Sequence, residues 1–117
     1  MQGIKSEPHA AALFYMSAGQ CNYYLGQYEE ALAHYDIAIR KVLKVVPGGD
    51  EPILGLIYYN RGLSNASLVR YQDAIVDFNA AKGTIEATKK AQVLFQLGAT
   101  ERKIANSNIP DRENRTP

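Results

Sequence analysis

The chain lacks tryptophan, and its 117 residues include only one cysteine and two histidines. Cys21 has no second cysteine with which to form an internal disulfide, which fits a reducing compartment. His9 and His34 lie far apart, and no Cys/His cluster or carboxylate pair has the spacing of a metal or catalytic site. We therefore expect no metal, no cofactor and no catalytic residue, and a helical-bundle enzyme is the least favoured class of function.

An excess of charge of one sign and a long hydrophobic run are also missing. Thirteen basic and twelve acidic residues give a formal net charge of +1, whereas nucleic-acid binding normally needs a basic face. No apolar stretch approaches the roughly 20 residues of a membrane-spanning helix. The first residues, MQGIKSEPHA, show no apolar run after a basic start. We expect no nucleic-acid partner, no membrane insertion and, by default, a cytoplasmic protein.

What the sequence does contain is a repeat, because residues 58–81 restate much of residues 15–38 at a period of 43 that aligns Gly19 with Gly62. The other matched pairs are Asn22 and Asn65, Tyr28 and Tyr71, Glu30 and Asp73, Ala31 and Ala74, Leu32 and Ile75, Tyr35 and Phe78, and Ala38 and Ala81. Such self-similarity is typical of units that cannot bury their apolar faces alone.

The apolar residues recur at helical rather than strand spacing. Ser6, Glu7 and Pro8 resemble a helix start, and Thr84 is a candidate cap for the last helix. Turn residues divide the chain into helices predicted over about 8–24, 28–43, 51–68 and 71–82, with a fifth after Thr84. We therefore predict an all-α fold, an α-solenoid of about five helices paired in antiparallel hairpins.

Three glycines occupy matching places inside these predicted helices. Glycine in a helix costs about 0.5–1 kcal/mol relative to alanine, so Gly19, Gly62 and Gly98 indicate close approach of a partner helix. Tyr35 and Phe78 are expected to fill the space between hairpins. Cys21, one helical turn from Leu25, is expected to be a buried thiol.

These residues resemble the motif of tetratricopeptide repeat (TPR) proteins. The first copy consists of Tyr15, Ala18, Gly19, Asn22, Ala31 and Tyr35, the second of Tyr58, Arg61, Gly62, Asn65, Ala74 and Phe78, and a half copy of Leu94, Leu97, Gly98 and Glu101. The period departs from the family's, which is about 34, by an insertion near residues 40–52. The resemblance implies a TPR-like domain over residues 9–106, which leaves an N-terminal extension (1–8). Within the domain it implies repeats at about 12–45 and 55–88 and a half-repeat or capping helix at about 91–106. The polar tail (107–117) has too few apolar residues to pack and is expected to be disordered.

In the family, the first helix of each pair lines a concave groove that binds peptides or partner segments. Carried onto this chain, the resemblance implies a groove formed by Met16, Gln20, Tyr23, Tyr59, Asn60, Leu63, Phe95, Gln96 and Arg102. Some relatives clamp the terminal carboxylates of heat-shock chaperones, and Asn60 matches one clamp position. The positions expected to be basic hold Met16, Gln92 and Gln96, so we do not expect that ligand.

Two functions remain open at this point. The first is a non-enzymatic adaptor or scaffold that binds a peptide or helix of a partner protein in the groove. The second is self-association into a homo-oligomer through the ends of the repeat stack, because nothing resembling a capping helix precedes the first predicted helix. The residues that would form that end are Ala10, Ala11, Phe14 and Ala18.

Overall fold

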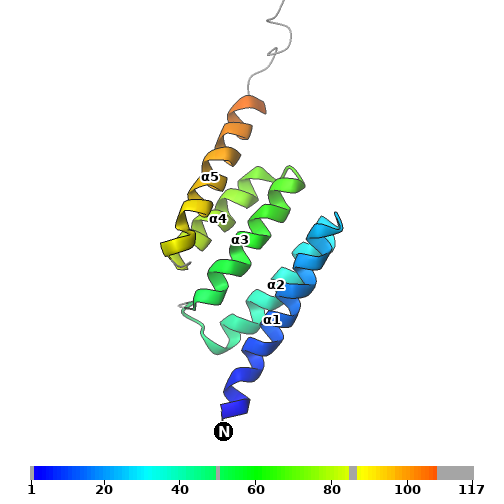
Figure 1. Cartoon of the computed structure of the whole chain (residues 1–117), viewed down its shortest axis with the longest axis vertical. Coiled ribbons are helices and arrows are strands. Elements are labelled where there is room, and N and C mark those ends of the chain that lie inside the picture. The colour runs from blue at the N-terminus through cyan, green and yellow to red at the C-terminus, as the bar shows by residue number, and fades with distance from the viewer. Residues whose placement is uncertain (1, 50, 85–86, 108–117) are drawn as a thin grey trace, which may run out of the picture.

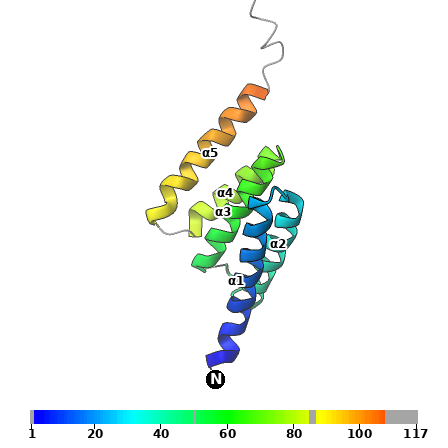
Figure 2. The ribbon, with the colours of Figure 1, turned by 45° about the vertical axis from the view of Figure 1, so that its right-hand side comes forward.

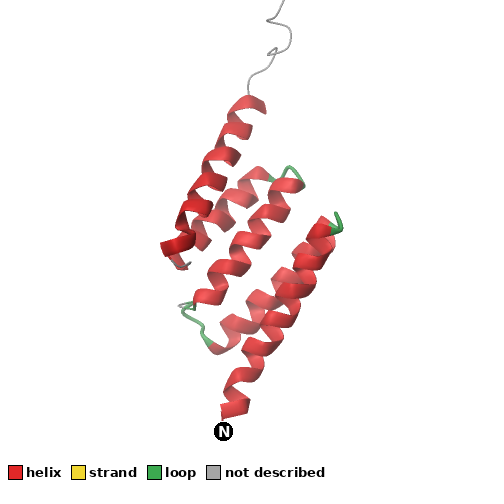
Figure 3. Ribbon diagram, in the orientation of Figure 1, coloured by secondary structure: helices red, strands yellow, loops and turns green. Residues whose placement is uncertain are grey.

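The protein is described by a computed structural model that covers residues 2–49, 51–84 and 87–107. Over these residues the chain is all-helical, with no strand (Figures 1 and 3). Its five helices are α1 (Gln2–Tyr24), α2 (Tyr28–Val45), α3 (Pro52–Ser67), α4 (Tyr71–Thr84) and α5 (Ala87–Ser107). The predicted all-α class is confirmed.

Consecutive helices run in opposite directions and pack against one another (Figure 1). The closest associations are those of α1 with α2 and of α3 with α4, while α2 contacts α3 and α4 contacts α5. In two views, α5 forms one edge of the described structure, with α4 as its neighbour (Figures 1 and 2). The short turns after residues 24 and 67 favour this antiparallel pairing.

The helix boundaries correct the prediction chiefly at the N-terminus. Because α1 begins at Gln2, Ser6 is not its cap, and residues 2–8 belong to the first helix rather than to a separate extension. Pro8 therefore lies inside α1, although an interior proline removes a backbone donor and its ring crowds the carbonyl four residues earlier. At the other end Ser107 closes α5, so it is not part of a disordered tail. Thr84, which was expected to cap the fifth helix, is instead the last residue of α4, and its hydroxyl donates to the carbonyl of Ala80 in that helix. The rest of the predicted tail lies outside the described residues.

Two core clusters hold the helices together: the first joins α1, α2 and α3, and the second joins α3, α4 and α5. In the first, Tyr35 packs with small and branched residues of its own hairpin and with Leu54 and Ile57 of α3. In the second, Phe78 packs with α5 through Val93 and Leu97. Each core therefore joins one hairpin to the helix that follows it, which is the packing expected of units that need a neighbour.

The glycines in the first helix of each hairpin permit this packing. A Cβ atom at Gly19 would lie 2.5 Å from the Tyr35 ring, and one at Gly62 would lie 2.6 Å from the Phe78 ring. The predicted close approach is thus confirmed at these two positions. At Gly98 no described atom lies within 4 Å of the corresponding point. Gly98 therefore matches the other two glycines in its place on the helix, but no described aromatic ring packs against it.

The turns inside the two hairpins repeat in the same detail. The amide of Gln27 donates to the carbonyl of Asn22, and the amide of Arg70 donates to that of Asn65, both at 2.8 Å. Gly26 takes a φ of 78°, and Val69, its equivalent at the period of 43, takes a φ of 64°. The second turn therefore places a β-branched residue in a conformation that suits glycine.

Candidate functional site

A hollow between α3 and α5 brings together residues from the predicted groove. It has a volume of about 400 Å³ and is lined by Tyr59, Ala91, Gln92, Phe95 and Gln96. We call it the α3–α5 hollow. Four of its five residues lie on α5, whose buried side chains one turn apart pack on the second core. Because neighbouring positions on a helix point in different directions, this packing leaves the two amides accessible to solvent.

Tyr59 forms the α3 side of this hollow. Its ring lies 5.8 Å from the ring of Phe78, so its inner edge belongs to the second core. Burial raises the pKa of the Tyr59 hydroxyl, a hydrogen bond with the Gln96 side chain opposes that shift, and the nearby Tyr23 adds to it. The hydroxyl is therefore neutral at ordinary pH and available for hydrogen bonds beside two amides.

The remaining predicted groove residues are spread over α1, α3 and α5. Gln20, Tyr23 and Asn60 are half-buried and do not line this hollow, and Leu63 packs against the second core. The assignment of Met16 to the groove is wrong, because only 8% of the residue is exposed and it belongs to the first core cluster. Its position follows the apolar stripe by which α1 packs on α2, so its side chain is not accessible to a partner.

A second hollow, with a volume of about 530 Å³, runs along α5 toward its C-terminal end. Its lining consists of Leu94, Phe95, Gly98, Ala99, Arg102, Lys103 and Asn106. We call this surface the α5 face. Phe95 borders both hollows, with 70% of its surface exposed, and the predicted groove residue Arg102 lies here rather than beside Tyr59.

The outer side of α1 is also uncovered. Phe14 is 67% exposed, whereas Ile57, its equivalent on α3, is fully buried in the first core. Cys21 is exposed, which corrects the expectation of a buried thiol, although its equivalent Ser64 is buried. The difference arises because α2 packs on that side of α3, while no described helix lies beyond α1.

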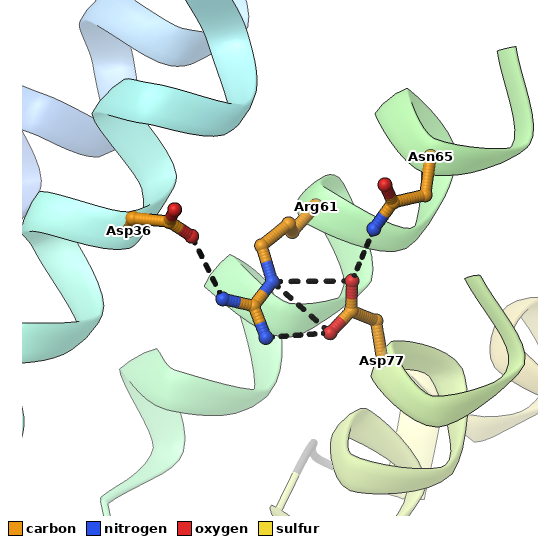
Figure 4. A network of polar contacts seen from close by, with 4 residues as sticks. All are labelled: Asp36, Arg61, Asn65 and Asp77. Atoms are coloured by element: carbon orange, nitrogen blue, oxygen red, sulfur yellow. Dashed lines mark hydrogen bonds and ion pairs between the residues drawn. The ribbon is translucent and has the colours of Figure 1, made fainter. Parts of the chain in front are cut away.

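A polar network that the sequence did not predict joins α2, α3 and α4 (Figure 4). The Arg61 guanidinium donates to both carboxylate oxygens of Asp77, at 2.7–3.1 Å, and to Asp36 at 2.9 Å. Asn65 donates to the same Asp77 carboxylate at 2.8 Å. Burial alone would lower the pKa of Arg61, but the hydrogen bonds and charges of Asp77 and Asp36 raise it above its ordinary value.

The network is structural in character rather than a ligand site. It borders a hollow of about 280 Å³, but the guanidinium is already shared by two carboxylates and so is not free to hold an anion. The first repeat has a simpler version, in which His34 and Asn22 make a hydrogen bond at 2.6 Å. Asn22 matches Asn65 in the repeat, and their partners, His34 and Asp77, are also 43 residues apart. The repeat therefore carried a signal for a hydrogen bond of the asparagine in each hairpin.

Within the described ranges, no group of three or more His, Cys, Asp and Glu side chains could hold a metal ion. None of the helices described here combines the length and hydropathy needed to cross a membrane.

The chain was also compared with known proteins. No family model, curated protein or solved structure matches it.

Proposed function

We propose that the chain is a protein-interaction module of TPR-like, α-solenoid architecture that binds a peptide or helix of a partner protein in the α3–α5 hollow. The observation that carries this proposal is the meeting of Tyr59, Phe95 and Gln96 in one hollow. The recurrence of hydrogen bonds and glycine contacts at a period of 43 supports the repeat architecture. On this proposal the protein is not an enzyme and acts as an adaptor or scaffold inside the cell.

The chemistry of the hollow suits a peptide backbone. An exposed aromatic ring offers apolar area, and aromatic residues with a few polar anchors are typical of protein recognition sites. The amides of Gln92 and Gln96 each supply donors and an acceptor, as a backbone requires. The hydroxyl of Tyr59 adds a third polar group.

The test compares partner capture by the native chain with capture by a Gln92→Ala, Gln96→Ala variant. Both substitutions favour the helix and leave the core untouched. Gln72→Ala, which removes an exposed glutamine from α4, is the matched control. We expect the double variant, but not the control, to lose partners measured by quantitative mass spectrometry. Equal capture by all three chains would show that the hollow is not the binding site.

Self-association through the α1 end is the second candidate function. The exposure of Phe14 at a position where Ile57 is fully buried favours it. Sedimentation over a range of concentrations tests it, with Phe14→Ala as the variant that should shift the chain toward monomer. A native chain that stays monomeric at every concentration would eliminate this candidate.

A further inference from the structure

Helix α5 occupies the place of a first helix whose second helix is absent from the described residues. In each complete hairpin, a glycine on the first helix receives an aromatic ring from the second, Gly19 from Tyr35 and Gly62 from Phe78. Gly98 lies at the matching position of α5, and no described atom lies within 4 Å of its Cβ point. The notch that accepts a ring is therefore present and empty.

The surface around this notch is apolar and unpacked. Leu94 is 53% exposed and Phe95 is 70% exposed, and both line the α5 face with Gly98 and Ala99. Figure 2 shows α5 at the edge of the described structure, and α4 is the helix packed against it. The exposure of Leu94 and Phe95 shows that α4 does not cover their side of α5. A helix laid along α5 would cover these side chains as α2 covers α1 and α4 covers α3.

The charge of α5 restricts what such a helix can be. The helix carries four basic and one acidic side chain, a surplus of three positive charges, and Arg102 and Lys103 line the hollow itself. In the existing hairpins, the second helices begin with acids, Glu29 and Glu30 in α2 and Asp73 in α4. An antiparallel helix with an acidic first turn would place those acids beside the two cations and complement its own dipole.

A further residue of α5 restricts which residue can precede the aromatic one on the docked helix. Asn22 and Asn65, three residues after their glycines, bind His34 and Asp77, which directly precede Tyr35 and Phe78. The equivalent residue on α5 is the exposed acid Glu101. A hydrogen-bond donor before the ring would pair with Glu101, whereas an acid there would be repelled.

We propose that the α5 face docks an amphipathic helix of another protein, antiparallel to α5. That helix carries an acidic first turn and an aromatic residue seated over Gly98, and a donor residue precedes the aromatic one. This surface is separate from the α3–α5 hollow, although Phe95 borders both. A second copy of the chain fits it poorly, because two α5 helices would bring the same surplus of positive charge together.

The chain itself supplies the probes for a test. A synthetic peptide of residues 27–45 has Glu29 and Glu30 in its first turn and His34 before Tyr35, so it meets every requirement. A peptide of residues 70–84 has one acid in its first turn and places Asp77 before Phe78. In calorimetric titration of the full chain, we expect the first peptide to bind, less tightly as salt rises. We expect the second peptide, and a Tyr35→Ala form of the first, to bind at least about tenfold more weakly.

The decisive variant is Gly98→Ala. In the free chain an added Cβ meets no described atom, and alanine favours the helix, so the melting temperature should stay equal or rise. In the complex the same Cβ would clash with the aromatic ring, and the affinity for the peptide of residues 27–45 should fall about tenfold or more. Equal binding to native and Gly98→Ala chains, or no binding to the native chain, would overturn the proposal.

Two further measurements separate this inference from its rivals. The Gln92→Ala, Gln96→Ala variant should bind the peptide as tightly as the native chain does. Failure of the proposed α3–α5 site and failure of the proposed α5 face can therefore be told apart. Sedimentation of the native chain should show no dimer that Gly98→Ala dissociates. Such a dimer would assign the α5 face to a second copy and refute the proposed partner.

Discussion

At the residue scale, the two ring-accepting glycines should be the positions least tolerant of a single methyl group. A Cβ at Gly62 would lie 2.6 Å from the Phe78 ring, and one at Gly19 would lie 2.5 Å from Tyr35. Gly62→Ala and Gly19→Ala should each lower the free energy of unfolding by about 1–3 kcal/mol in urea denaturation. The matched control is Gly98→Ala, which should raise it by about 0.5–1 kcal/mol. A uniform effect at all three positions would contradict the packing described.

Val69 is a second residue at which the repeat predicts the effect of a substitution. Its φ of 64° places a β-branched side chain in the left-handed region, where the equivalent residue is Gly26. Since that conformation costs about 1–2 kcal/mol for a residue with a Cβ, Val69→Gly should stabilise the chain by up to about 1 kcal/mol. The reciprocal substitution Gly26→Val should destabilise it. Thermal unfolding of both variants checks the prediction. A lower melting temperature for Val69→Gly, or an unchanged or higher one for Gly26→Val, would refute it.

Tyr35 should make the fold sensitive to alkali. Burial raises the pKa of its hydroxyl, and the charges that Tyr23, Tyr24 and Cys21 acquire at high pH raise it further. Because the folded pKa lies above the ordinary value of about 10, this contribution to stability is complete below that pH and is lost as the pH rises through the folded pKa. Tyr35→Phe, which copies Phe78, should lose less stability between about pH 8 and about pH 11 than the native chain. An identical loss in both chains would show that another group is responsible.

At the element scale, the Arg61 network should hold α4 to α3 more firmly than it holds α2. Asp77 is 3% exposed, whereas Asp36 is 48% exposed. Removing one partner of a buried pair costs about 3–5 kcal/mol, but an exposed pair contributes about 0–1 kcal/mol. Asp77→Asn should therefore lower the free energy of unfolding several times more than Asp36→Asn. Denaturant titration of the two variants measures the free energies of unfolding. Equal losses would show that the network does not hold α4 more firmly than α2.

Most helix boundaries could be predicted from the sequence. Periodicity and turn residues placed α2, α3 and α4 within about two residues of their observed ends. Gly26 before α2, Pro47 after it and Pro52 at the start of α3 marked several of these boundaries. The start of α1 was missed because Ser6 and Pro8 form a convincing start signal inside a longer helix. Recurrence predicted the glycine notches but not the network, since Arg61 and Asp77 differ from their equivalents, Ala18 and His34.

The candidate site was predictable only in part, for a related reason. Tyr59, Phe95 and Gln96 meet because α5 packs against the second core, a contact between residues distant in sequence. Met16 was assigned to the groove by resemblance, yet helix packing buries it. Exposure at the ends depends on which neighbour is present. Phe14 was expected at an open end and is exposed, whereas Cys21 was expected to be buried and is exposed, because no described helix covers its side of α1.

At the scale of the whole molecule, the described structure is two complete hairpins followed by a single helix. The interior faces are buried by neighbouring helices, while the outer side of α1 and the α5 face are not. Local stability should follow this arrangement, since elements with fewer buried contacts open more readily. Amides of α5 should therefore exchange with solvent faster than those of α2 and α3.

Amide hydrogen exchange, measured with and without the peptide of residues 27–45, tests this arrangement most directly. The structure predicts that the peptide slows amide exchange in α5, with the largest effect around Gly98. The exchange rates of α1 and α2 should stay unchanged. An α5 that is already as protected as α3 in the free chain, or that is unaffected by a bound peptide, would contradict the view that α5 is a first helix awaiting its partner.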